Sequence, residues 1–145
     1  MNLSQGGDFP HNPNNPGMGT IKLEPKASLS IEENNAAQAF MDKGYHVTGL
    51  CESNISGIQK TRTADLYVQE FGKVEVYSPK NTEPTSIVRN IEKKGQSSTF
   101  LIQAKISSDA MQTISNRIFG KPNCQHIIFL FFDPNTGEIL VYKKN

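Results

Sequence analysis

The sequence predicts a single α+β domain in which a mixed β-sheet is flanked by helices. In some segments every second residue is apolar, as in a β-strand, and in others apolar residues recur every three or four positions, as in an α-helix. The two kinds of segment alternate along the chain. Residues 126–132 form a continuous apolar run, which is typical of a central strand buried on both faces. The chain has 145 residues, of which 36% are hydrophobic and 20% are charged, as is ordinary for one domain with its own core.

Several classes of protein are excluded by the composition. No range approaches about 18 consecutive apolar residues, so no transmembrane helix and no stable membrane association are predicted. The N-terminus lacks the apolar run of a signal peptide. Cys51 and Cys124 have neither zinc nor redox spacing and are too few for a disulfide scaffold.

The first 27 residues are expected to be a flexible linker or tail, and the folded domain is expected to occupy residues 28–145. Residues 6–19 contain three Pro, four Gly and three Asn and show no apolar period. Such a composition does not predict a packed core.

The first helix is expected to begin at Ser30, because Ser30 and Glu33 have the spacing of a capping box. The helix ends before Gly44, which suits the left-handed conformation that closes helices. Residues 45–50 then alternate like a strand, and residues 51–60 are expected to be a loop.

Residues 63–69 and 73–78 are expected to form two strands joined by a tight turn. Because successive side chains of a strand alternate, Glu75 projects to the face opposite Val74 and Val76.

The remaining elements complete the order α-β-β-β-α-β-α-β-β. One helix begins near Pro84 and is closed by Gly95, and the next is capped by Ser108 and Asp109 and ends at Gly120. The strands are expected at residues 99–105, 126–132 and 138–143, the last two joined by a turn.

Asp65 and Glu75 are candidate ligands of a divalent metal, either Mg²⁺ or Mn²⁺. They lie on neighbouring predicted strands, so both carboxylates are able to converge on one ion. Lys80 follows the second strand and would stabilise developing negative charge. The alternative is that both carboxylates are exposed positions on a half-solvated hairpin.

This arrangement resembles the core of PD-(D/E)xK nucleases. The pattern departs from that family at Tyr77, which stands where the family has a lysine, and a lysine arrives only at Lys80. In that family the preceding helix supplies a further carboxylate, for which Glu33 is the candidate. A purely structural role in the capping box also explains Glu33 fully.

Longer segments are similar to the C-terminal toxin domains of contact-dependent growth inhibition systems, many of which are transfer-RNA nucleases. The segments that carry this resemblance are Glu33–Ala39, Gly44–Val47, Ala64–Leu66, Glu75–Pro79, Val88–Ile91 and Lys94–Gln96. The resemblance begins near Ser30 and reaches the C-terminus. It implies delivery by a secreted or cell-surface carrier, action in the cytoplasm of a target cell, and neutralisation by a cognate immunity protein.

Other functions remain open at this point. A metal-independent ribonuclease of the barnase-like type would use a general base, an acid and cations. Its candidates are His46, Tyr77, Lys80, Arg89 and His126. A deoxyribonuclease, or a non-catalytic nucleic-acid-binding or immunity module, is a further alternative.

Basic residues gather in the part of the chain that would contact RNA. Seven of the fifteen Lys and Arg residues lie between Lys60 and Lys94. Candidate phosphate contacts are Lys60, Arg62, Lys80, Arg89, Lys93 and Lys94. Tyr67 or Tyr77 would stack on an unpaired base, and Gln96 would orient the scissile phosphate.

Overall fold

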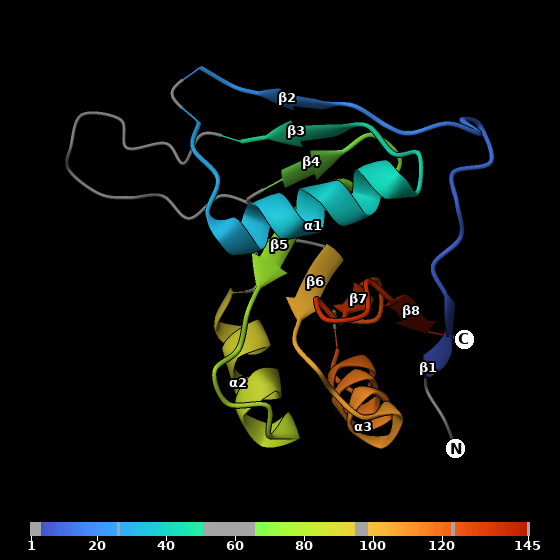
Figure 1. The fold of residues 1–145 in the computed structure, drawn as a ribbon. Coiled ribbons are helices and arrows are strands. Elements are labelled where there is room, and N and C mark those ends of the chain that lie inside the picture. The colour runs from blue at the N-terminus through green and yellow to red at the C-terminus, as the bar shows by residue number, and fades with distance from the viewer. Residues whose placement is uncertain (1–3, 26, 51–65, 95–98, 123, 145) are drawn as a thin grey trace. The chain divides into compact units, whose positions relative to one another are not determined.

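The computed structural model describes residues 4–25, 27–50, 66–94, 99–122 and 124–144. Over these residues the chain forms three helices and a mixed sheet of eight strands (Figure 1), which confirms the α+β class. From α1 onward the elements follow the predicted order α-β-β-β-α-β-α-β-β. The chain divides into two compact units, Pro10–Val76 and a second that combines Met1–Phe9 with Tyr77–Asn145. No helix among the described residues is long and apolar enough to cross a membrane.

The unit Pro10–Val76 is a sheet with one helix packed on it. Its elements are β2 (Ile21–Leu23), α1 (Ile31–Asp42), β3 (Val47–Gly49), β4 (Leu66–Val68) and β5 (Gly72–Tyr77), the last residue of which belongs to the other unit. β2 pairs with β3 in parallel, and β3–β4 and β4–β5 pair antiparallel. The apolar side chains between helix and sheet are buried: Ala36, Ala37, Ala39, Phe40, Val47, Leu66, Val68 and Val74.

The caps of α1 are those expected from the sequence. The hydroxyl Oγ of Ser30 accepts a hydrogen bond from the Glu33 backbone N–H (3.1 Å), and Glu33 Oε1 accepts one from the Ser30 N–H (2.7 Å). Gly44 has a φ of 84°, the left-handed region that glycine enters without steric cost.

The second unit contains β1 (Ser4–Asp8), α2 (Pro84–Lys94), β6 (Thr99–Gln103), α3 (Ser108–Phe119), β7 (Ile128–Phe132) and β8 (Ile139–Lys144). Its strands lie in the order β1-β8-β7-β6, with β6–β7 parallel and the other two pairs antiparallel. α2 and α3 lie side by side in Figure 1. Their apolar sides pack into a core with β6 and β7 whose fully buried members include Ile87, Ile91, Phe100, Ile102, Ile114, Ile118 and Phe129.

Local boundaries differ by one or two residues from those expected. The N-cap of α3 is Ser107, which accepts from the Ala110 N–H, and not Ser108. Gly120 is the C-cap, as expected. β7 begins at Ile128, so His126 precedes the strand and is exposed.

Within the first 27 residues, the structure differs from the linker expected there. β1 pairs antiparallel with β8 along its whole length, β2 pairs with β3, and Phe9 is buried. The asparagines have a specific role: Asn12 and Asn15 both donate through Nδ2 to the carbonyl of Gly44, over 3.1 and 2.9 Å. They therefore satisfy a carbonyl just beyond the C-terminus of α1, where backbone acceptors lack helical partners.

Candidate functional site

The predicted site residues are distributed over described and undescribed parts of the chain. Glu33, Glu75, Tyr77, Lys80, Arg89 and Lys93 are described. Asp65, Lys60, Arg62 and Gln96 lie outside the described residues, as does the side chain of Lys94.

Glu75 is a buried carboxylate on β5, with 7% of its surface exposed. It follows the buried Val74, from which it points to the opposite face because strand side chains alternate. The alternative in which Glu75 is an exposed position on a half-solvated hairpin is therefore wrong. A carboxylate is buried at a cost unless its charge is compensated, so Glu75 is unlike an ordinary surface residue.

Tyr77 ends β5 and is held by α2. The side-chain Nδ2 of Asn90 donates a hydrogen bond to the Tyr77 hydroxyl oxygen over 2.8 Å. Tyr77 is half-buried and packs against the core of its unit. The aromatic side chain that replaces the lysine of the nuclease pattern is therefore in a defined position.

Helix α2 has distinct faces because its residues repeat every 3.6 positions. Ile87, Val88 and Ile91 face the core. Glu92 forms an ion pair with Lys121 at the end of α3, 3.4 Å from Oε1 to Nζ. The side next to α3 also carries Thr85, whose hydroxyl accepts from Nη1 of Arg117 over 2.9 Å.

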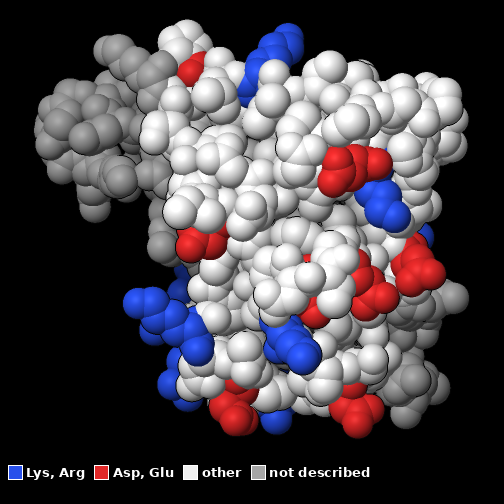
Figure 2. Space-filling model, in the orientation of Figure 1, with Lys and Arg blue, Asp and Glu red and all other residues white. Residues whose placement is uncertain are grey.

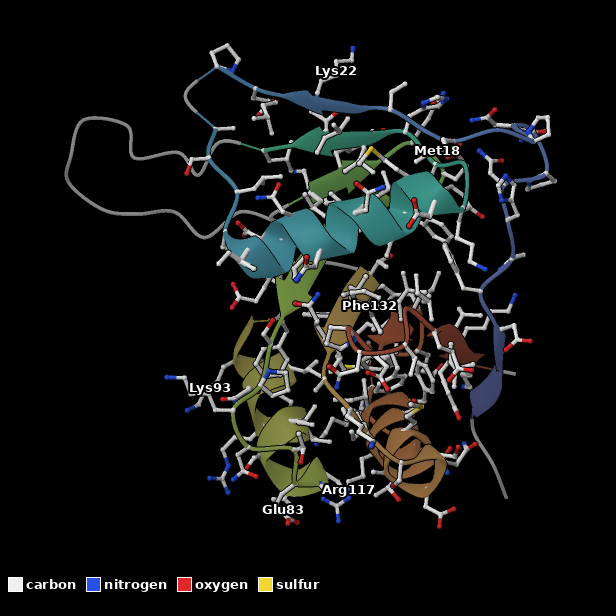
Figure 3. All side chains as sticks on the ribbon, viewed as in Figure 1. Met18, Lys22, Glu83, Lys93, Arg117 and Phe132 are labelled. Atoms are coloured by element: carbon white, nitrogen blue, oxygen red, sulfur yellow. The ribbon has the colours of Figure 1, made fainter. Side chains whose placement is uncertain are left out.

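The outward face of α2 carries Arg89 and Lys93, one turn apart and both exposed. Lys80, in the segment between β5 and α2, is also exposed. Among the described residues none of these three cations forms an ion pair. Figure 3 shows Lys93 projecting from α2, and Figure 2 shows basic side chains at the same edge of the molecule. The positive charges on this face are therefore able to bind an anionic partner.

A buried amide that the sequence analysis missed lies at the end of β6. Gln103 is 7% exposed, and its Oε1 accepts from the hydroxyl of Ser78 over 3.3 Å. Its Nε2 is buried and has no hydrogen-bond partner among the described residues. The signal in the sequence was a single amide ending the otherwise apolar stretch Phe100–Gln103. Buried polar groups are nearly always paired, so this donor is a candidate for function.

The remaining candidates have separate environments. Glu33 makes both hydrogen bonds of its capping box, as expected if its role is to cap α1. The Nδ1 of His46 accepts from the Thr20 N–H over 3.2 Å and lies 2.9 Å from the Thr20 hydroxyl. His126 is exposed and precedes β7, although the apolar run of residues 126–132 predicted a buried strand from that position.

The metal site expected from the sequence rests on Asp65 and Glu75. In the described part of the chain, no three His, Cys, Asp or Glu residues are grouped so as to hold a metal ion. Glu75 supplies an oxygen donor of the kind that Mg²⁺ and Mn²⁺ prefer. The second proposed ligand, Asp65, belongs to the undescribed range, so the pair stays a prediction.

Together these features define an α+β protein with a mixed sheet, a buried carboxylate and a cationic helix. No protein-family model matches the chain, and no curated protein is similar to it in sequence. Among solved structures, its fold is similar to that of a chain from the "CdiA-CT/CdiI toxin and immunity complex from Burkholderia pseudomallei". The TM-score is 0.54 and the identity 19%, over 88% of this chain and 100% of that chain. The fold is thus similar to that of a chain from a toxin and immunity complex, which agrees with the resemblance stated for the sequence.

Proposed function

We propose that this chain is a toxin domain of a contact-dependent growth inhibition system and that it is a ribonuclease acting on transfer RNA. The observation that carries the proposal is the similarity of its fold to a chain of a toxin and immunity complex. By the same analogy, a carrier protein delivers the domain, the domain acts in the cytoplasm of the target cell, and a cognate immunity protein neutralises it.

The reacting groups we propose are Asp65 and Glu75, with Lys80 and Tyr77. In the proposal, the carboxylates of Asp65 and Glu75 hold one divalent cation between them. A bound Mg²⁺ or Mn²⁺ would polarise the phosphate and lower the pKa of a bound water.

The protein's own residues would bind and orient the RNA. Lys80 would place a positive charge beside the phosphate, where charge develops in the transition state. Arg89 and Lys93 would hold the RNA backbone. Both are exposed and neither forms an ion pair with a described residue, which supports this arrangement. In the proposal, Lys60, Arg62, Lys94 and Gln96 extend this surface.

The proposal is tested by inducing the chain in cells and separating their RNA on a gel. We expect growth arrest and discrete transfer-RNA fragments. Purified protein should produce the same fragments in vitro, and EDTA should abolish them. If the fragments persist in EDTA, the protein is a ribonuclease but does not use the proposed metal site. The reacting groups would then be Tyr77, Lys80, Arg89 and a histidine.

Intact RNA in healthy cells would overturn the proposed function. Cleavage of DNA in place of RNA would replace it by a deoxyribonuclease. Co-expression of the immunity protein is the matched control, because it should restore growth without a change in the amount of toxin.

A further inference from the structure

In the described part of the unit Pro10–Val76, the one helix, α1, lies on one face of the sheet, and the other face carries none. In β4 the buried Leu66 and Val68 alternate with Tyr67, whose surface is 42% exposed. Leu66 and Val68 lie on the same side of the sheet as α1, so Tyr67 projects from the other side. The exposed ring of Tyr67 offers a flat apolar surface on which another aromatic group is able to stack.

The register places Tyr67 in a row that crosses four strands. Lys22 on β2 pairs with Thr48 on β3, Thr48 with Tyr67 on β4, and Tyr67 with Lys73 on β5. Side chains of directly paired residues lie on the same face, a few ångströms apart. This Lys-Thr-Tyr-Lys row therefore presents one aromatic ring between two amines.

The two lysines and the tyrosine of the row are exposed, and Thr48 between them is half-buried. Lys22 and Lys73 are exposed and form no ion pair with any described residue, and Tyr67 makes no hydrogen bond within the same part of the chain. Figure 3 shows Lys22 extending from β2 away from α1. An anionic ligand with a flat face would be able to contact the ring and both amines at once.

The row lies beside the proposed reacting carboxylate. Lys73 and Glu75 are two residues apart on β5, so their side chains project to the same face of this sheet. A ligand that lies along the row would thus have its neighbouring segment close to Glu75.

We propose that this row is a docking platform for an unpaired stretch of the RNA substrate. One base stacks on Tyr67, and the phosphates on either side are held by Lys22 and Lys73. Aromatic residues on an open sheet with flanking cations are a general means of binding single-stranded RNA. The platform rests on the proposed ribonuclease function and gives it a substrate class, an RNA whose target region is single-stranded.

Binding of a labelled oligouridylate of about ten nucleotides to the full chain tests the platform. The 2′-hydroxyls are methylated and EDTA is present, so that neither chemical route cleaves the probe. We expect Tyr67→Ala to weaken binding by about 5- to 150-fold, and Tyr67→Phe to bind as the wild type does, because the ring stacks in both. Lys22→Ala and Lys73→Ala should each lower the salt slope of binding by about 0.7.

Lys143→Ala, which removes an exposed lysine from β8, is the matched control and should leave affinity unchanged. Equal affinity of the wild type, Tyr67→Ala and the two lysine variants would overturn the platform. Unchanged RNA binding together with weaker binding of an immunity protein would assign the face to a protein instead. Cleavage is measured separately, on unmodified transfer RNA with Mg²⁺ and without EDTA. Weaker probe binding by the variants, together with no cleavage by the wild type, would retain the platform and reject the nuclease. Cleavage by the wild type, together with unchanged probe binding by the variants, would retain the nuclease and reject the platform.

Discussion

The side-chain amide of Asn90 donates a hydrogen bond to the hydroxyl oxygen of Tyr77 over 2.8 Å, and so connects the middle of α2 to the end of β5. We predict a coupling energy of about 0.5–1.5 kcal/mol between the two side chains, because a typical intramolecular hydrogen bond contributes that much. A double-mutant cycle with Asn90→Ala and Tyr77→Phe, followed by urea unfolding, measures it. Arg89→Ala on the neighbouring position is the control and should change stability by less than about 0.5 kcal/mol. Additive effects of the two changes would contradict the prediction.

Replacing Glu75 by Gln should abolish toxicity while the fold is retained. The amide has nearly the same shape as the carboxylate but no charge, so it fills the same buried position and binds a divalent cation poorly. Asp65→Ala should give the same loss. Growth after induction and RNA gels measure activity, and circular dichroism measures folding. Killing at the wild-type level by either folded variant would place the chemistry elsewhere.

Glu33→Gln separates the two roles considered for Glu33. Glutamine also suits the third position of a capping box, so we expect normal toxicity and nearly normal stability. Ser30→Ala should instead lower the free energy of unfolding by about 1 kcal/mol, through loss of the cap. If Glu33 were a metal ligand, Glu33→Gln would lose cleavage activity at unchanged thermal stability.

Gln103→Met should raise the free energy of unfolding by about 1 kcal/mol, because it removes a buried donor that has no partner among the described residues. If that amide serves the reaction, RNA cleavage should fall in the same variant. Thermal unfolding and a cleavage assay on one preparation measure the two effects. Ser78→Ala, which removes the partner of Oε1, is the control and should not be stabilising. A destabilised Gln103→Met would show that the amide is satisfied in solution.

The paired change Arg89→Ala with Lys93→Ala should weaken RNA binding without cost in stability. Like charges one helical turn apart repel each other slightly, so their removal does not destabilise α2. If each contacts one phosphate, the salt slope falls by about 0.7–0.9 for each residue. Lys121→Ala is the matched control, since that lysine pairs with Glu92. Equal losses in the control would indicate a general charge effect and not a specific surface.

Most of the fold was predictable because its signals are local. The capping box joins residues three positions apart, and the hairpin of β4 and β5 needs only a short turn between alternating strands. The apolar sides of α2 and α3 follow from their 3.6-residue period. The sequence predicts a linker over the first 27 residues, whereas the structure has β1 there. β1 was not predictable from local signals because its partner is at the opposite end of the chain, where Ser4 pairs with Lys144. Because β1 is held by backbone hydrogen bonds, it needs no alternating apolar side chains, and the segment rich in Gly and Asn shows none.

The sequence by itself determined the order of the elements from α1 onward, the caps of α1, and the identity of the residues that carry charge. Only the tertiary structure decided that Glu75 is buried, that Asn90 reaches Tyr77, and that Nε2 of Gln103 has no hydrogen-bond partner among the described residues. It also decided that Lys22, Tyr67 and Lys73 share one row. The physical reason is distance along the chain. Propensity, period and capping act within a few residues, whereas burial and cross-strand contact depend on strands that meet only when the chain has folded.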